Sequence, residues 1–310
     1  ADMMHFSGCR GRLLIDSCYF AGAQDDAINI HGTNLKVVEK VSSNTLNMRF
    51  SHGQSYGFQA YFTGDTVAFV KATTMERLST ASVHSVKRLS DRIWQVKFDR
   101  EVPEWLEINH DCVENLTYTP SVEIRNNYFT RTSTRGTLVT TPRKVVIEKN
   151  TYYKVGMSAI LIEGDAEGWF ESGPVNDVLI RENTFVDCAY NGGPGNAVIA
   201  INPSNSVINA NRPVHKNIRI ENNLFKSFNT PLLFAKSTEG ILFANNTVER
   251  TMQLRFSAKN DIMFYLNGCK DVTIRNVICK EGVSNKEIYI DNMKRAYVKK
   301  PVGMNIRISK

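Results

Sequence analysis

Short stretches in which apolar and polar residues alternate recur along most of the chain. The clearest is VEIRNNYF at residues 122–129, and copies of it lie at 145–152, 178–185, 218–225 and 241–248, with weaker ones at 13–20 and 272–279. Alternation with a period of two is typical of a β-strand that buries one face. The pattern therefore predicts a chain built from short, similar strands.

Each strong copy carries an asparagine at the same place, namely Asn127, Asn150, Asn183, Asn223 and Asn246. Successive copies are 23, 33, 40, 23 and 31 residues apart. A constant minimum with variable excess is typical of a solenoid whose coils tolerate inserted loops. Because asparagine suits turns, we expect the asparagines to bridge successive coils at one corner. The aromatic residues two positions later should form an internal column.

A second apolar strand follows each asparagine corner, at residues 137–141, 158–164, 196–201 and 231–236. Together these features predict an all-β protein, a right-handed parallel β-helix. An antiparallel sandwich is the alternative, but it would need hairpin turns between neighbouring strands. It would also leave the fixed asparagine column unexplained.

One region interrupts the repeat. Between the early coils and residue 122, alternating strands are expected at 35–41, 45–50, 66–71, 82–88 and 92–98, with turns between them. About five short strands separated by turns are typical of a small β-barrel. The predicted organisation is thus β-helix coils at 1–33, an inserted barrel at 34–118, a β-helix continuation at 119–282 and a C-terminal cap or tail at 283–310.

Two early strands carry acids that align with each other. Shifting the chain by 24 residues places Asp2 on Asp26, while Asp25 lies beside the pair. Strands of successive coils lie about 4.8 Å apart, so three carboxylates should crowd one small patch. Such crowding costs stability through like-charge repulsion and is typical of functional sites.

Composition narrows the class of protein. The chain has 310 residues, 42% of them hydrophobic, and a formal charge of +7 with basic residues scattered among 31 acids. No stretch reaches the roughly 20 apolar residues of a membrane span, and no nucleic-acid-binding module is visible.

The six cysteines have no CxxC spacing, so free, mostly buried thiols are expected rather than structural zinc. The start at Ala1 and Asp2, inside a strand, indicates a piece of a longer protein.

Clustered carboxylates suit the hydrolysis of a glycosidic bond. One acid donates a proton to the leaving oxygen, and an ionised one activates water or attacks the anomeric carbon. Two alternatives stay open at this point. One is a plain acidic turn, and the other is a calcium site with oxygen ligands from Asp16, Asn29 or Asn34.

Other residues are candidates for contact with a substrate. His31 follows the acidic strand, and Arg135 and Glu163 come from equivalent positions on later coils. Trp169, in an inserted loop, is a candidate platform for a sugar ring, as are Tyr56 and Phe58 of the barrel. His52 and Gln54 belong to the same barrel loop. No residue is predicted to bind a metal or cofactor.

Three segments together resemble glycoside hydrolase family 110, the bacterial exo-acting α-1,3-galactosidases. They are FSGCRGRLLIDSCYFAGAQDDAINIHGT, GFQAYFTGDTVAFV and LIEGDAEGWFESGPVNDVLIRENTF. The resemblance implies an inverting, metal-independent enzyme that removes terminal α-linked galactose from glycans and is secreted or periplasmic. It implies Asp25 as the acid and Asp2 with Asp26 as the base.

Two other functions remain possible from the sequence. A polygalacturonase-like hydrolase or lyase acting on acidic polysaccharide would need basic residues around the acids, and none flanks them on their own strands. A non-catalytic β-helix that binds glycans would be indifferent to the loss of these carboxylates. The sequence does not indicate an oligomeric state.

Overall fold

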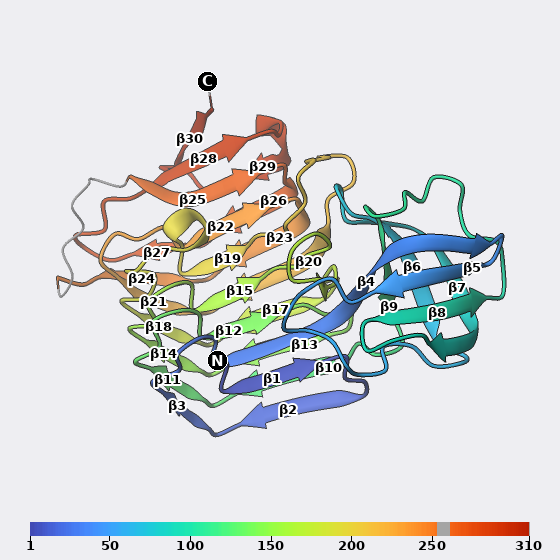
Figure 1. Cartoon of the computed structure of the whole chain (residues 1–310). Coiled ribbons are helices and arrows are strands. Elements are labelled where there is room, and N and C mark those ends of the chain that lie inside the picture. The colour runs from blue at the N-terminus through green and yellow to red at the C-terminus, as the bar shows by residue number, and fades with distance from the viewer. Residues whose placement is uncertain (253–260, 310) are drawn as a thin grey trace.

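The computed structural model describes residues 1–252 and 261–309, and it shows a stack of coils with a small barrel at its side (Figure 1). Residues 253–260 of the predicted continuation, and Lys310 of the predicted tail, lie outside the described residues. Three parallel sheets run along the stack, and nearly every coil gives one strand to each. The predicted fold class, a parallel β-helix with an inserted barrel, is confirmed.

The strands of the β-helix fall into three sets. Sheet 1 consists of β1 (Met4–Ser7), β4 (Ile28–Ser42), β12 (Thr137–Val139), β15 (Ile160–Ile162), β19 (Ile199–Ile201), β22 (Leu233–Lys236), β25 (Ile262–Asn267), β28 (Glu287–Asp291) and β30 (Asn305–Ile308). Sheet 2 consists of β2 (Arg12–Asp16), β10 (Ser121–Arg125), β13 (Val145–Glu148), β17 (Val178–Arg181), β20 (His215–Glu221), β23 (Thr238–Ala244), β26 (Lys270–Arg275) and β29 (Val298–Lys299). Sheet 3 consists of β3 (Tyr19–Ala21), β11 (Tyr128–Thr130), β14 (Thr151–Tyr153), β18 (Thr184–Val186), β21 (Leu224–Ser227), β24 (Thr247–Arg250) and β27 (Ile278–Cys279).

The asparagine corner between sheets 2 and 3 has the predicted bridging role. Asn150 Oδ1 accepts hydrogen bonds from the backbone and side-chain nitrogens of Asn127, both at 2.9 Å. The same pair of bonds joins each later asparagine to the next, up to Asn246. The left-handed turn conformation lies one residue earlier, with φ of 57° at Asn126 and 55° at Lys149. The ladder asparagine therefore serves as a buried bridge, and its neighbour makes the turn.

Aromatic rings fill the interior behind this corner, as predicted. Phe20, Phe129, Tyr152, Phe185 and Phe225 stack in a column with centroid separations between 4.5 and 5.2 Å. Isoleucines and valines of sheets 1 and 2 pack against the column to form one continuous core. This core fixes the register of the coils, because a shift by one residue would turn every apolar side chain outward.

The inserted barrel grows out of sheet 1. Strand β4 begins in that sheet and continues into the barrel, where β5 (Thr45–Arg49), β8 (Ile93–Phe98), β7 (Glu76–Arg88), β6 (Thr66–Lys71) and β9 (Cys112–Asn115) follow in order. The pairing of β9 with β4 closes the ring, and all its contacts are antiparallel. Strand β9 was not predicted, since it has only four residues. The shared strand ties the barrel to the coil that carries Asp25 and Asp26.

The remaining elements are short. They are β16 (Glu171–Ser172), η1 (Pro194–Asn196) and η2 (Arg295–Tyr297). The segment predicted as a cap or tail contributes β28, β29 and β30, which extend sheets 1 and 2 as further parallel strands.

All six cysteines are free, and Cys112, Cys188 and Cys269 are buried. Within the described residues, no helix has the length and apolarity that crossing a membrane requires.

Replacing Asn183 with alanine should lower the free energy of unfolding by about 3 kcal/mol or more. The change leaves the buried N–H of Asn150 without an acceptor, at about 1–3 kcal/mol, and removes one hydrogen bond each from the Asn150 side-chain amide, the Ile147 carbonyl and the Asn223 side chain, at about 0.5–1.5 kcal/mol for each bond. Chemical denaturation measures the loss. Asn211→Ala, at an exposed loop position, is the control and should stay within about 0.5 kcal/mol of the parent. A loss equally small for Asn183→Ala would contradict the bridging role.

Candidate active site

The two aligned acids meet on consecutive coils. Strand β1 pairs with β4 so that Met4 lies opposite Ile28, which is the 24-residue register predicted from the sequence. The backbone N–H of Asp26 donates to Asp2 Oδ1 at 3.1 Å. One oxygen from each of Asp2, Asp25 and Asp26 lies within 4.8 Å of the others. The structure thus brings the three predicted catalytic residues into one cluster.

Arg135, at the corner before β12 on the next coil, neutralises part of this cluster. Its Nε lies 2.6 Å from Asp26 Oδ1, its Nη2 donates to Asp26 Oδ2 at 2.9 Å, and Nη2 lies 3.4 Å from Asp25 Oδ1. Asp26 is only 1% exposed. Burial raises the pKa of Asp26 to about 7 although Arg135 opposes the rise, and the negative charges of Asp2 and Asp25 add to it. Asp25 differs, because its side chain is 47% exposed.

The surroundings of Asp2 lower its pKa, whereas those of Asp26 raise its pKa. Burial raises the pKa of Asp2, but hydrogen bonds from His5, the Asp26 backbone and Asn29 outweigh burial and bring the pKa below its ordinary value. His5 Nδ1 lies 3.1 Å from Asp2 Oδ2, and Asn29 Nδ2 donates to the same oxygen at 3.3 Å. The cluster therefore contains one carboxylate that stays ionised and a neighbour that takes up protons near neutral pH.

The acids open into a pocket of about 380 Å³ between the β-helix and the barrel. The predicted contacts Gln54, Arg135, Glu163 and Trp169 all line it, together with Ala1, Asp2, His5, Asp25, Asp26, Asn29, Ser55, Leu138 and Glu171. Burial raises the pKa of Glu163 to about 7 and also raises that of Glu171. Five carboxylates therefore face a pocket whose cationic groups are Arg135 and His5.

A short loop brings Trp169 over the pocket. The Asp165 carboxylate accepts hydrogen bonds from the backbone N–H groups of the next residues: from Glu167 at 2.7 Å, from Gly168 at 2.8 Å and from Trp169. The indole is 50% exposed, and its ring centroid lies 3.9 Å from that of His52. The loop from the β-helix and the loop from the barrel thus meet as one wall. His52 supports Trp169 and lines the adjoining cavity rather than the acidic pocket.

The comparisons with known proteins agree with this picture. Residues 45–113 match the family described as GLAA-B beta-barrel domain II. Alpha-1,3-galactosidase A of Bacteroides fragilis strain YCH46 is 66% identical over 299 residues, covering 96% of this chain and 49% of that protein. The chain is a homologue of the bacterial α-1,3-galactosidases. The predicted resemblance to that family is confirmed.

More distant α-1,3-galactosidases match as well. Alpha-1,3-galactosidase A of Bacteroides thetaiotaomicron is 38% identical over 278 residues, covering 89% of this chain and 47% of that protein. Alpha-1,3-galactosidase B of Akkermansia muciniphila is 39% identical over 250 residues, covering 80% of this chain and 31% of that protein. The chain therefore spans half or less of the α-1,3-galactosidases it matches.

Several predictions about the site need correction. His31 is 4% exposed and does not line the acidic pocket, since both of its ring nitrogens are turned to other protein atoms. Tyr56 lies under the Arg92 guanidinium, 3.8 Å from it, and Phe58 packs on Phe50. Trp169 is thus the one predicted platform placed at the acids.

The oxygen ligands proposed for calcium do not assemble. Asp16 lies on sheet 2 and pairs with Arg125, and the Asn34 side chain donates to the Asp165 carbonyl. Only Asn29 lies beside the acids, through Asp2. The Arg135 guanidinium already supplies a positive charge at Asp25 and Asp26. The arrangement therefore favours acid–base chemistry over a calcium site.

Two residues of the pocket, His5 and Glu171, were not predicted from the sequence. His5 lies opposite Asn29 in the β1–β4 pair, so the register already placed it on the outer face beside the acids. Glu171 arrives on the two-residue strand β16, which runs antiparallel to β4 and approaches closely at Gly32. A side chain at position 32 would collide with Ser172. A strand of two residues carries no periodic signal, so Glu171 could not be predicted from pattern.

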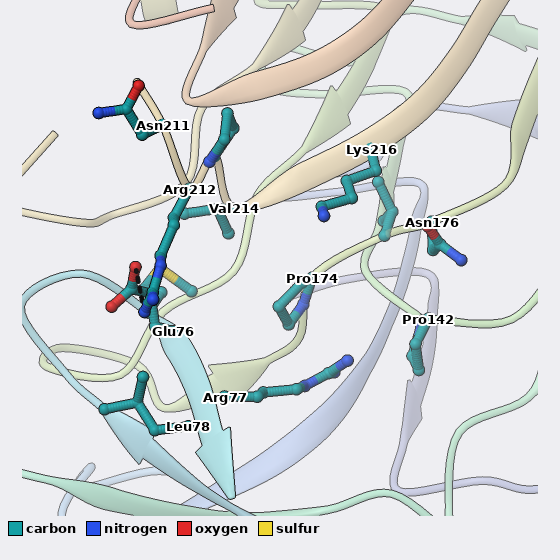
Figure 2. A pocket seen from close by; sticks show the side chains of 13 residues that line it. Glu76, Arg77, Leu78, Pro142, Pro174, Asn176, Asn211, Arg212, Val214 and Lys216 are labelled. Atoms are coloured by element: carbon teal, nitrogen blue, oxygen red, sulfur yellow. Dashed lines mark ion pairs between the residues drawn. The ribbon is translucent and has the colours of Figure 1, made fainter. Parts of the chain in front are cut away.

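A second pocket lies where the start of β7 meets the β-helix (Figure 2). Its volume is about 430 Å³, and it is lined by Met75, Glu76, Arg77, Leu78, Pro142, Pro174, Val175, Asn176, Asn211, Arg212, Pro213, Val214 and Lys216. Glu76 is the one carboxylate among these lining residues, and Arg77 is already paired with the buried Glu114. This pocket lacks the paired acids that glycoside hydrolysis requires.

Proposed function

We propose that the protein containing this chain is a glycoside hydrolase that removes terminal α-1,3-linked galactose from glycans. The observation that carries the proposal is the cluster of Asp2, Asp25 and Asp26 on consecutive coils, open to one pocket. The α-1,3-galactosidase relatives supply the substrate class. Release of galactose from oligosaccharides or glycoconjugates fits a secreted or periplasmic protein.

In the proposed reaction, Asp25 is the general acid. Its side chain is 47% exposed, which leaves the carboxyl group accessible to the leaving oxygen of a bound glycan. Asp2 and Asp26 are held by fixed partners, His5 with Asn29 and Arg135 respectively. Asp2, which stays ionised, takes the proton of a water that attacks the anomeric carbon, and Asp26 in its ionised form shares in holding that water; as the glycosidic bond breaks, Asp25 protonates the leaving oxygen. Attack from the opposite face inverts the anomeric configuration.

Carboxylate spacing does not decide the stereochemistry. Inverting enzymes usually separate their carboxyl groups by about 6.5–9.5 Å and retaining enzymes by about 5–5.5 Å. Here one oxygen of each acid lies within 4.8 Å of the others; this is a distance between single atoms, whereas the two ranges describe whole carboxyl groups. Inversion therefore rests on the family resemblance and on the choice of water as the nucleophile.

The decisive experiment follows galactose release by the full-length protein with NMR. Linear and branched α-1,3-galactosides are the substrates, and we expect β-galactose as the first anomer to accumulate. α-Galactose as the first product would refute inversion. No galactose release from any such glycan would refute the substrate class.

The charge of the pocket disfavours acidic polysaccharide as the substrate. A uronate carboxylate needs a free cation, whereas Arg135 is engaged by Asp26 and Asp25. The pocket's five carboxylates would repel a further negative group. A neutral sugar such as galactose avoids this cost.

A further inference from the structure

Three short contacts connect Asp2 to the interior of the protein. His5 Nδ1 lies 3.1 Å from Asp2 Oδ2, His5 Nε2 lies 2.7 Å from His31 Nε2, and His31 Nδ1 lies 2.6 Å from the Gly32 carbonyl. The two imidazole rings meet nearly edge to face, with an interplanar angle of 65°. The three contacts form a continuous hydrogen-bond relay from the Asp2 carboxylate in the pocket to the Gly32 backbone carbonyl.

Hydrogen-bond chemistry assigns the protons along this chain. The Gly32 carbonyl can only accept, so His31 Nδ1 carries a hydrogen, and a neutral His31 then offers the lone pair of Nε2. His5 Nε2 must donate to that lone pair across 2.7 Å. Asp2 accepts hydrogen bonds from the Asp26 backbone N–H and from the Asn29 side chain, and it also faces His5 Nδ1. These donors favour the ionised form of Asp2. His5 therefore carries a hydrogen on both nitrogens, as an imidazolium.

The charged groups around the two rings support this assignment. His5 faces Asp2 on its own segment, Asp26 from the β4 coil and Glu171 from β16. The hydrogen bond to Asp2 is the largest influence and raises the pKa of His5, although partial burial opposes the rise. His31 is surrounded by His5, Asp2 and the Gly32 carbonyl, and burial lowers its pKa to about 4. Its Nε2 also lies 3.4 Å from Glu171 Oε1.

A shared metal ion fits this geometry less well than a proton. One ligand atom from each of His5, His31 and Glu171 lies within 4.8 Å of the others, which is close enough to suggest a metal site. Two imidazole nitrogens on a tetrahedral zinc, each at about 2.0–2.1 Å, stand roughly 3.4 Å apart. The observed 2.7 Å is instead the length of an N–H···N hydrogen bond.

We propose that His5 and His31 are positioning residues that keep Asp2 ionised: neutral His31 accepts a hydrogen bond from His5, which carries a hydrogen on both ring nitrogens and holds the Asp2 carboxylate as a base. The inference rests on the proposed function for its role in catalysis. Its structural part, the protonation of the two rings, stands independently of any activity. Neither histidine takes part in a bond-breaking step.

Histidine NMR on the full-length protein tests the protonation directly. Signals of the two rings are assigned by their loss in His5→Gln and His31→Gln. We expect His5 to titrate above about 6.5, the ordinary histidine value, and His31 to stay neutral with its hydrogen on Nδ1 down to about pH 4. His31→Leu removes the acceptor and should lower the His5 pKa, whereas His31→Gln retains an acceptor and should lower it less. A His5 pKa at or below the ordinary value, or one unchanged in His31→Leu, would overturn the proposal.

The pH profile of galactose release distinguishes positioning from packing. Without the His5 charge, Asp2 takes up a proton at higher pH, so the acidic limb of kcat/KM in His5→Gln should move upward. Activity below the limb falls about tenfold for each unit of that shift, activity above it should largely recover, and KM should change less than threefold. An equal loss at every pH would indicate a purely structural role and overturn the proposal. If the parent protein releases no galactose, the proposed function fails, while the NMR result still decides the state of His5.

Discussion

Asp25→Asn in the full-length protein is expected to lower kcat for α-1,3-galactoside hydrolysis by about 10²–10⁴-fold. The amide has the same shape as the carboxyl group but cannot deliver a proton to the leaving oxygen, and general acid catalysis contributes about 10²–10⁴-fold. Asp26→Asn should have a comparable effect, because it removes one of the two carboxylates proposed to activate water. Initial rates of galactose release measure both variants.

The fold should survive both changes. Asp25 is half-exposed, and an asparagine at position 26 can still accept a hydrogen bond from Arg135. Asp16→Asn is the matched control, since Asp16 is an acid paired with an arginine on sheet 2, away from the pocket. It should keep the parent's activity. If Asp25→Asn and Asp26→Asn kept it too, the cluster would not be catalytic, and the glycan-binding β-helix would become the better account.

Arg135→Gln is expected to lower the free energy of unfolding by about 3–5 kcal/mol at pH 8, because it leaves the buried Asp26 carboxylate without its partner. The penalty should shrink on acidification. The pKa of Asp26 in the folded protein is raised to about 7 from an ordinary value of 3.8. The contribution of Asp26 to the free energy of unfolding is therefore largest at a pH below 3.8 and is lost as the pH rises through about 7. Removing Arg135 strengthens this trend.

Urea denaturation at pH 5 and pH 8 provides the measurement. Combining Arg135→Gln with Asp26→Asn removes both charges and should recover much of the stability at pH 8. Arg125→Gln, which breaks the more exposed pair with Asp16, should have a much smaller effect. An Arg135→Gln penalty equal at the two pH values would show that Asp26 is not the group responsible.

The sequence predicted the parts of the structure that repeat. Alternating strands and the column from Asn127 to Asn246 gave the coils and their corner, because one residue type at one position can bridge coil after coil. The 24-residue alignment likewise placed Asp2 beside Asp26, since parallel strands of successive coils pair in register. These features depend on local periodicity, which is visible in a single sequence.

Features made by non-repeating contacts could not be predicted. Arg135 was recognised as a candidate, but its pairing with Asp26 joins residues 109 positions apart across the inserted barrel. The closure of the barrel by β9, and the delivery of Glu171 by β16, depend on strands of four and two residues. His31 was expected to face a substrate, yet the ring of His5 covers it. Such contacts follow from tertiary packing, not from pattern.

Asp2, Asp25 and Asp26 together are proposed to form the galactose-binding and hydrolytic site. The crystal structure of the full-length Asp25→Asn variant with an unhydrolysed α-1,3-linked digalactoside tests this proposal most directly. We expect the terminal galactose among Asp2, Asp26 and Arg135, with the glycosidic oxygen beside residue 25 and Trp169 against the sugar. A digalactoside bound elsewhere, for example in the pocket of Figure 2, with the acidic pocket empty of sugar, would contradict the account.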